Sequence, residues 1–191
     1  MGIDPRGIGR PAVFLDRDGV INRAEVRDGR PFPPARVEDL EVLPGVGPAL
    51  SRLRDAGFLL VVVTNQPDVA RGTQRRDVVD AMHAALAATL PIDAFCVCPH
   101  DDGDGCGCRK PEPGLILEAA RARRIDLRRS VMVGDRWRDV EAGRRAGCAT
   151  VFVDRGYAER RAETPDTVVG SLDEAVDWIL SRRGTDLDEA D

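Results

Sequence analysis

Short apolar runs alternate along the chain with longer stretches of helical periodicity. The apolar, β-branched runs cover residues 12–16, 59–64, 94–98, 131–134 and 150–153, with a weaker sixth run at 167–169. Because these runs are nearly continuous in apolar character, they are typical of central strands that are covered on both faces. We therefore expect a buried sheet built from these segments.

Amphipathic stretches fill most of the intervals between the expected strands. Helices are predicted at residues 47–56, 73–90, 113–124, 138–146 and 171–183. Thr73 is a good N-capping residue, Gly57 stops the first helix, and Ser171 with Glu174 forms a capping-box pattern. The alternation predicts an α/β fold with a doubly wound, Rossmann-like parallel sheet.

The pattern indicates one domain over residues 12–183, with an N-terminal extension (1–11) and an acidic tail (184–191) expected to be disordered. A length of 191 residues with 42% hydrophobic content suits one domain with a real core. Residues 23–43 carry three prolines and mixed charge, and are expected to form a long loop. No interval is long enough for a large cap domain.

The overall charge argues against two classes of partner. A net charge of −5, with arginines interspersed among acids, is not the clustered positive charge that nucleic acids require. No apolar stretch approaches the roughly 20 residues that span a bilayer, and the N-terminus lacks the apolar core of a secretory signal. We expect a cytoplasmic protein, without nucleic-acid or membrane partners, that is a monomer.

Two carboxylates follow the first apolar run. Asp16 ends the run, Asp18 lies two residues later, and Gly19 allows the chain to turn away. Side chains two residues apart on a strand point the same way, so both carboxylates should face one site beyond the carboxyl end of a buried strand. Neighbouring carboxylates repel unless a cation or a shared proton relieves them. The pair predicts a divalent metal, an acid/base pair, or both.

Three further polar sets lie near the expected strand ends. They are Thr64, Asn65 and Gln66; Arg109 and Lys110; and Asp135 and Asp139. Together with the first pair they supply a nucleophile or metal ligand, a hydroxyl donor, an ammonium group and further carboxylates. This set suits phosphoryl transfer, which depends on positioning and on neutralising the charge of oxygen atoms.

Four of the five cysteines cluster with a histidine in residues 96–108. Cys-x-His and Cys-x-Cys pairs flank a polar, glycine-rich loop, a spacing that suits tetrahedral zinc. A disulfide is the alternative, which a cytoplasmic location disfavours.

In this order, the motifs resemble the haloacid dehalogenase superfamily of phosphohydrolases. Within it, five segments look like the D-glycero-D-manno-heptose-1,7-bisphosphate 7-phosphatases. They are residues 14–22 (FLDRDGVIN), 43–46 (LPGV), 64–66 (TNQ), 70–72 (ARG) and 108–111 (CRKP). The resemblance, which includes the cysteine cluster, runs from about residue 12 to residue 153, and the histidinol-phosphate phosphatases are similar relatives.

The resemblance implies a covalent mechanism. Asp16 would attack phosphorus and form an aspartyl-phosphate, and Asp18 would protonate the leaving oxygen and then activate water. A magnesium ion would lie between Asp16, the backbone carbonyl of Asp18 and Asp135. Thr64 and Lys110 would hold the phosphate oxygens.

The resemblance also suggests supporting residues. Asp139 would orient Lys110 or a metal-bound water without contacting the substrate itself. Alternatively, it is a carboxylate at a helix N-terminus that interacts with the helix dipole. The substrate-binding candidates are Asn65, Gln66, Arg71, Arg109 and Arg136. As an alternative to substrate binding, Arg109 and Arg136 could be ordinary surface charges. Asn65 and Gln66 could instead lie in a turn that satisfies their side-chain amides.

By resemblance, the zinc ligands are Cys98, His100, Cys106 and Cys108, in a loop spanning residues 96–110. Cys96 is surplus and is expected to be a small buried hydrophobic residue. Four protein ligands leave no open position for water, so the zinc would be structural.

Residues 23–34 depart most from the heptose enzymes, which leaves the substrate open. We expect a magnesium-dependent phosphatase with a zinc-stabilised loop acting on a small phosphorylated sugar, foremost D-glycero-D-manno-heptose 1,7-bisphosphate at its 7-phosphate. Histidinol phosphate is the alternative substrate. A non-catalytic, zinc-folded binding module is the alternative from another class.

Overall fold

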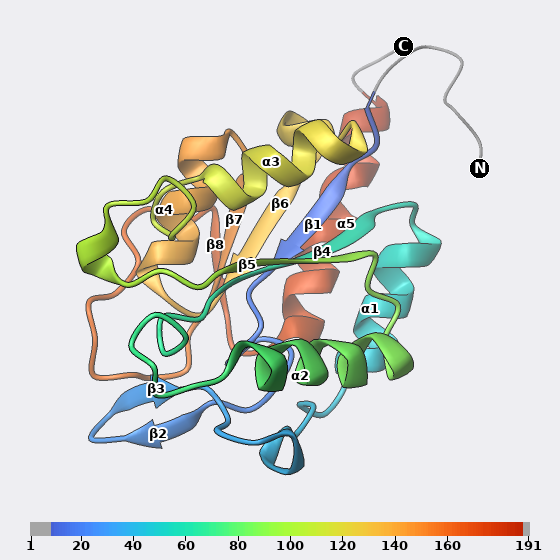
Figure 1. The fold of residues 1–191 in the computed structure, drawn as a ribbon. Helices are drawn as coiled ribbons and strands as arrows, with labels where there is room; N and C mark the ends of the chain where they lie inside the picture. The colour runs from blue at the N-terminus through green and yellow to red at the C-terminus, as the bar shows by residue number, and fades with distance from the viewer. Residues whose placement is uncertain (1–8, 189–191) are drawn as a thin grey trace.

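A six-stranded parallel sheet forms the centre of the molecule in the computed structural model, which describes residues 9–188 (Figure 1). Its order is β5-β4-β1-β6-β7-β8. The strands are β1 (Ala12–Leu15), β4 (Leu59–Asn65), β5 (Ala94–Cys98), β6 (Val131–Gly134), β7 (Ala149–Val153) and β8 (Thr167–Val169). All six expected strands are present, and the predicted α/β fold with a doubly wound parallel sheet is confirmed.

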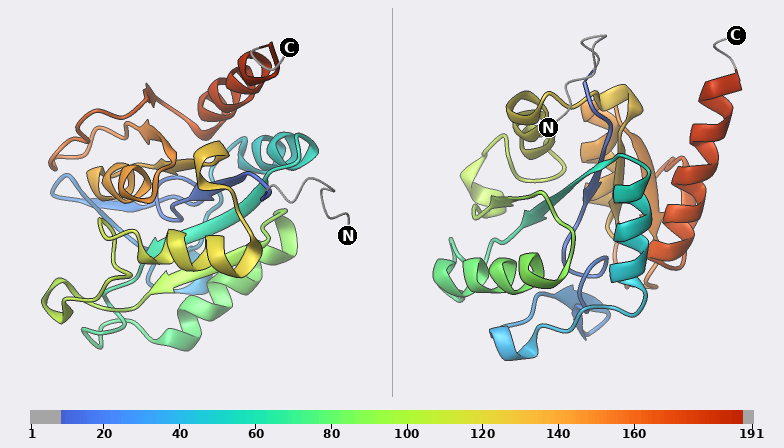
Figure 2. Two further views of the ribbon diagram at one scale, coloured as in Figure 1. Left: turned by 90° about the horizontal axis from the view of Figure 1, so that it is seen from above. Right: turned by 90° about the vertical axis from the view of Figure 1, so that its right-hand side faces the viewer.

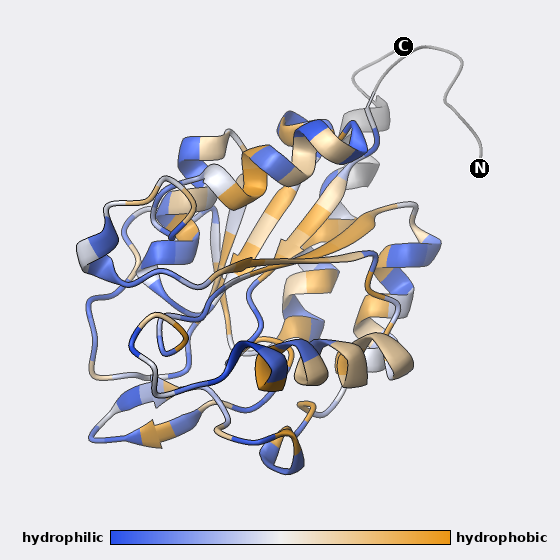
Figure 3. Ribbon diagram, viewed as in Figure 1, coloured by the Kyte–Doolittle hydropathy of each residue, from blue (hydrophilic) through white to orange (hydrophobic). Residues whose placement is uncertain are grey.

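Helices cover both faces of this sheet (Figure 2). They are α1 (Val46–Asp55), α2 (Arg76–Thr89), α3 (Gly114–Arg123), α4 (Trp137–Ala146) and α5 (Leu172–Asp188). Side chains of α1 and α5 pack on one face, with part of α2, and those of α3 and α4 pack on the other. Figure 3 shows why: the strands are hydrophobic throughout, whereas the helices are hydrophobic mainly towards the sheet.

Strand β1 occupies the centre and divides its side chains between the two cores. Val13 and Leu15 join the cluster under α1 and α5, while Phe14 joins the cluster under α3 and α4. β1 pairs in parallel with both β4 and β6. The carboxyl ends of these three strands therefore meet at one edge of the sheet, where an open α/β fold binds its ligands.

The segment expected as a long loop over residues 23–43 contains a β-hairpin instead. Strands β2 (Glu25–Arg27) and β3 (Arg30–Phe32) pair antiparallel, and a 3₁₀ turn (Val37–Asp39) follows. Asp28 and Gly29 both have positive φ angles, of 50° and 74°. This is the backbone of a two-residue hairpin turn that Asp-Gly favours. The prolines obscured this signal, because proline usually argues against a strand. Pro31 is compatible with β3 because β3 is a short edge strand.

Two helix boundaries differ from those expected. The Thr73 hydroxyl bonds to the Asp68 carbonyl within a series of turns, so α2 begins three residues later, at Arg76. At α5, the Ser171 hydroxyl accepts a bond from the Glu174 N–H as predicted, whereas the Glu174 carboxylate accepts from the Gly170 N–H. That helix continues to Asp188, through most of the segment expected as a disordered tail. Most of the N-terminal extension (1–8) and the end of the tail (189–191) lie outside the described residues.

Within residues 9–188, none of the helices combines the length and the apolar character needed to cross a bilayer.

Candidate active site

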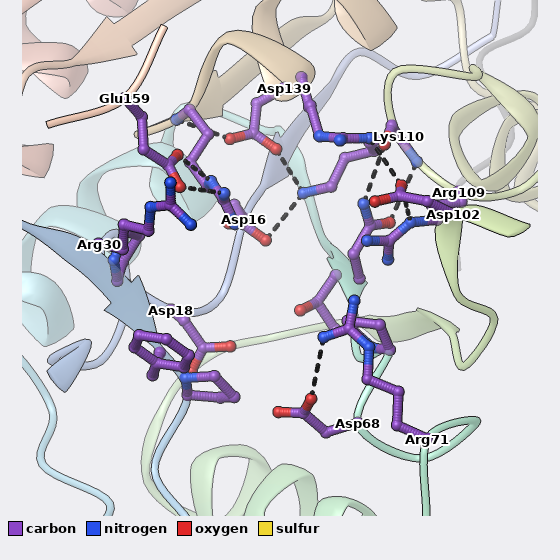
Figure 4. A pocket seen from close by; sticks show the side chains of 18 residues that line it. Asp16, Asp18, Arg30, Asp68, Arg71, Asp102, Arg109, Lys110, Asp139 and Glu159 are labelled. Carbon is purple, nitrogen blue, oxygen red and sulfur yellow. Dashed lines mark hydrogen bonds and ion pairs between the residues drawn. The ribbon is translucent and has the colours of Figure 1, made fainter. Parts of the chain in front are cut away.

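Three charged side chains from distant segments meet at the carboxyl edge of the sheet (Figure 4). Asp16 follows β1, Lys110 precedes α3, and Asp139 lies in the first turn of α4. The Lys110 Nζ lies 2.8 Å from Asp16 Oδ1 and 2.5 Å from Asp139 Oδ1. It also donates to the Val63 carbonyl at 2.8 Å. All three side chains are nearly inaccessible to solvent, which leaves Lys110 fixed between two carboxylates.

Burial and mutual proximity shift the pKa values of this group. Burial raises the pKa of Asp16 to about 6, the Lys110 ammonium opposes this, and Asp139 and Asp18 add to it. Burial alone would lower the pKa of Lys110, but Asp139 and Asp16 raise it above its ordinary value. Lys110 is therefore a permanent cation at this site, and it favours the ionised form that a nucleophilic carboxylate needs.

Asp135, which directly follows β6, has the properties of a metal ligand. Both carboxylate oxygens are buried, and neither has a hydrogen-bond partner among the described residues within ordinary geometric limits. Burial raises the pKa of Asp135 well above its usual range, with further contributions from Asp16 and Asp139; the nearby Tyr157 hydroxyl acts in the opposite direction. One oxygen each from Asp16, Asp135 and Asp139 lie within 4.8 Å of one another. Buried carboxylate oxygens without donors fit a hard divalent cation.

Gly19 is required beside Asp135 for steric reasons. Its φ angle is +87°, and a Cβ atom at this position would lie 1.7 Å from Asp135 Oδ2. The backbone after β1 therefore approaches the carboxylate closely, as only glycine allows.

Asp18 is oriented by three side chains. Arg17, which is fully buried, donates to both carboxylate oxygens at 2.9–3.2 Å. Asn22 and Gln66 donate one bond each, at 2.9 Å and 2.8 Å. Arg17 is itself bonded to His83 Nε2 of α2 at 3.2 Å. The sequence analysis gave no role to Arg17 or His83; the only available signal was that His83 lies on the buried face of its helix.

The residues at the end of β4 take different positions. Thr64 lines the pocket, and its hydroxyl accepts a bond from the Gln66 amide. Asn65 also lines the pocket and clamps the Lys110 backbone, bonding to its N–H at 3.1 Å and its carbonyl at 3.0 Å. Gln66 is buried behind the pocket wall and reaches Asp18, so its place is that of an orienting residue.

A pocket of about 340 Å³ opens above these groups. The three arginines predicted to bind substrate all line it, and each is paired with an acid. Arg71 bonds to Asp101, Arg109 to Asp102, and Arg136 to Glu159. Glu159, in the segment after β7, was not anticipated, because nothing local in its sequence indicates a partner 23 residues away.

The predicted zinc ligands also converge. Ligand atoms of Cys98, His100, Cys106 and Cys108 lie within 4.8 Å of one another. The three Sγ–Sγ distances are 3.3, 3.4 and 3.7 Å, and His100 Nδ1 lies 3.3 Å from Cys108 Sγ. A tetrahedral site with Zn–S bonds of about 2.3 Å requires sulfurs about 3.8 Å apart. The cluster has nearly this geometry, and the five cysteines form no disulfide.

Two residues left open by the sequence have clear surroundings. Cys96 lies in β5 and packs against the core under α3 and α4, away from the four-residue cluster. Trp137 is half-buried, with the guanidinium groups of Arg138 and Arg160 over its ring at 5.1 Å and 4.5 Å. It is not among the residues that line the pocket.

Comparison with known proteins identifies the family. A family model described as "HAD-hyrolase-like" matches residues 107–175. The chain is 38% identical over 195 residues to the D-glycero-D-manno-heptose-1,7-bisphosphate 7-phosphatase of Thermosynechococcus vestitus, covering 90% of this chain and 96% of that one. The chain belongs to the heptose-bisphosphate phosphatase family of the haloacid dehalogenase superfamily.

Two further relatives agree with this assignment. The D-glycero-beta-D-manno-heptose-1,7-bisphosphate 7-phosphatase of Haemophilus ducreyi is 36% identical, over 90% of this chain and all of the relative. Among solved structures, D,D-heptose 1,7-bisphosphate phosphatase from B. bronchiseptica, complexed with magnesium and phosphate, superposes with a TM-score of 0.77. It is 33% identical, covering 90% of this chain and 99% of that one. The chain is therefore a phosphoric monoester hydrolase of the haloacid dehalogenase type, as predicted.

Proposed function

We propose that this enzyme removes the 7-phosphate of D-glycero-D-manno-heptose 1,7-bisphosphate through an aspartyl-phosphate. The observation that carries the proposal is the fixed arrangement of Asp16, Lys110 and Asp139 beneath a pocket of about 340 Å³. The likeness to curated heptose-bisphosphate phosphatases over 90% of the chain supports this choice of substrate.

The geometry suits a two-step displacement. Asp16 Oδ1 is bonded to Lys110, which favours the carboxylate form, and Oδ2 would attack phosphorus. Lys110 and the Thr64 hydroxyl, both at the pocket wall, are placed to bind phosphate oxygens as negative charge redistributes. The aspartyl-phosphate splits hydrolysis into two steps with lower barriers. Asp18 gives a proton to the departing sugar oxygen in the first step and removes one from the attacking water in the second.

Magnesium is the cofactor that the carboxylates fit. Asp16 and Asp135 would hold it, together with the Asp18 backbone carbonyl, and it would neutralise carboxylate and phosphate charge. Asp139 is bonded to Lys110 and to the Arg136 N–H, so its place is to orient the lysine.

Zinc is proposed for the Cys/His cluster, in a structural role. Arg109, next to ligand Cys108, donates to the carbonyl of His100 at 3.2 Å, so the cluster is coupled directly to the pocket wall. The loop that zinc would hold also carries Lys110.

A side-by-side assay of two substrates tests the assignment. With magnesium present, kcat/KM for heptose 1,7-bisphosphate should exceed that for histidinol phosphate by at least about tenfold, or about 1.4 kcal/mol in transition-state binding. A preference for histidinol phosphate would replace the proposed substrate. Failure to hydrolyse even p-nitrophenyl phosphate would favour a non-catalytic module.

A further inference from the structure

The β2–β3 hairpin contacts the segment that carries Glu159. The Ala158 N–H donates to the Gly29 carbonyl at the hairpin turn, at 2.8 Å. A Cβ atom on Gly29 would lie 2.6 Å from the Ala158 Cβ, so the two segments touch. The hairpin is therefore positioned against the pocket, although most of its residues are exposed.

One strand of the hairpin forms part of the pocket wall. Arg30, Pro31 and Phe32 of β3 line the pocket. In Figure 4, Arg30 and Glu159 lie on one side of the pocket, while Arg71 and Arg109 lie on the other. The hairpin thus places a guanidinium group opposite two others, at the outer part of the site.

Arg30 differs from the other arginines of the pocket in its charge pairing. Four of them are paired with carboxylates: the arginines at positions 71, 109, 136 and 138. Among the side chains that the structure describes, in residues 9–182, none forms an ion pair within 4.0 Å or a hydrogen bond with the Arg30 side chain. Its cross-strand neighbour Arg27 is bonded to Glu25 and lies over the Phe32 ring at 5.3 Å. The Arg30 guanidinium lies near Glu159 without bonding to it, so its donors remain available to a molecule in the pocket.

We propose that Arg30 binds the second anionic group of the substrate, the phosphate at the end of the sugar remote from Asp16. This inference rests on the proposed function, which supplies a bisphosphate. A guanidinium offers a planar pair of donors that matches phosphate geometry. The acid-paired arginines must share their donors with carboxylates, whereas Arg30 binds an anion without breaking an existing pair.

The pocket dimensions are consistent with this assignment. Its volume of about 340 Å³ lies at the lower end of the range for small-ligand sites. Asp16 and Lys110 line the same pocket as β3, so a substrate whose reacting phosphate lies at these two residues extends towards the hairpin. Selection for a bisphosphate would then depend on a hairpin in the segment where the sequence departs most from the heptose enzymes.

The selectivity ratio is the measurement that tests Arg30. Steady-state kinetics with magnesium would compare heptose 1,7-bisphosphate with heptose 7-phosphate, which lacks the remote group, in wild type and in Arg30→Gln. We expect the ratio of the two kcat/KM values to fall about tenfold in the variant, mainly through KM for the bisphosphate. Arg30→Lys keeps the charge but not the paired donors, so its ratio should be intermediate.

Arg27→Gln is the matched control, because it removes a hairpin arginine that does not line the pocket. Its selectivity ratio should equal that of the wild type. An equal loss on both substrates in Arg30→Gln, or no loss, overturns the assignment, since a structural role would not change the ratio. A wild-type enzyme that does not prefer the bisphosphate would instead refute the proposed substrate before any variant is measured.

Discussion

Asp16 is held between two opposing influences. Burial and the neighbouring carboxylates favour its protonated form, whereas Lys110 at 2.8 Å favours the ionised form. A metal ion would add to the effect of Lys110, so the nucleophile becomes fully available when the cation is bound.

Asp16→Asn should therefore separate catalysis from folding. We expect phosphatase activity to fall by at least about 10³-fold, because an amide cannot form the aspartyl-phosphate. The variant should remain folded, with a Tm close to that of the metal-free wild type, because Asp139 still pairs with the buried Lys110. Steady-state assays and thermal unfolding measure the two quantities. Activity close to wild type would end the nucleophile assignment.

Gly19→Ala tests the close approach to Asp135. The new methyl group would displace the carboxylate, so the magnesium concentration for half-maximal activity should rise by about tenfold or more. Gly45→Ala is the matched control: its φ angle of +80° imposes a similar backbone strain, but nothing lies within 4 Å of the added Cβ. Magnesium titrations of both variants would show whether the clash, rather than the strain, matters.

His83 adds a pH-dependent contribution to stability. Burial and the adjacent Arg17 lower its pKa to about 4, from 6.5 in the unfolded chain. Between pH 6.5 and pH 4 the His83 imidazole is protonated in the unfolded state but not in the folded state. The stabilising contribution of His83 to the free energy of unfolding is therefore fully present above pH 6.5 and is lost as the pH falls towards 4. The loss is on the order of 2 kcal/mol after allowing for partial exposure.

His83→Gln, which retains an acceptor for Arg17, should lose less stability than the wild type between pH 7 and pH 4.5. Urea unfolding at several pH values measures the difference. Parallel pH profiles for the two proteins would contradict a neutral, buried His83.

At the scale of elements, two short segments complete the site. The β2–β3 hairpin supplies one wall, and the loop between β5 and α3 carries both the Cys/His cluster and Lys110. Neither belongs to the regular sheet-and-helix framework. The loop has few apolar side chains to bury, so we expect metal binding to contribute strongly to its order.

Cys106→Ser should remove this order, whereas Cys96→Ser should not. We expect about one equivalent of zinc to be lost in the first variant, with a fall in Tm of roughly 5–10 °C and reduced activity through Lys110. Elemental analysis after gentle purification, together with thermal unfolding, checks both variants. Wild-type protein without stoichiometric zinc would refute the zinc assignment.

At the scale of the whole molecule, the described surface gives little reason for self-association. Among the side chains described, in residues 9–182, the exposed large hydrophobic ones are Val26, Phe32, Val42 and Val168. They form a small set, and one of them, Phe32, lines the pocket. Stable dimers usually bury a larger apolar area. We expect a monomer by light scattering, and a concentration-dependent dimer would contradict this.

Local sequence was sufficient to predict most of the framework and to propose a set of site residues, several of which the structure brings together. Continuous apolar runs predicted the strands, because burial on both faces requires it of every side chain in the run. Asp16 and Asp135 could be placed at one edge because each directly follows such a run. The hairpin was missed, since a short, exposed pair of strands leaves little hydrophobic pattern.

What the sequence alone determined was thus the fold class, the family motifs and the set of groups for phosphoryl transfer. Only the tertiary structure decided which of these groups touch. Lys110 and Asp16 lie 94 positions apart, and Arg136 and Glu159 lie 23 apart. Periodicity reports only on near neighbours along the chain. Ion pairs of this kind, and the unbonded guanidinium of Arg30 at the pocket, depend on how the packed sheet, loops and hairpin bring distant segments together.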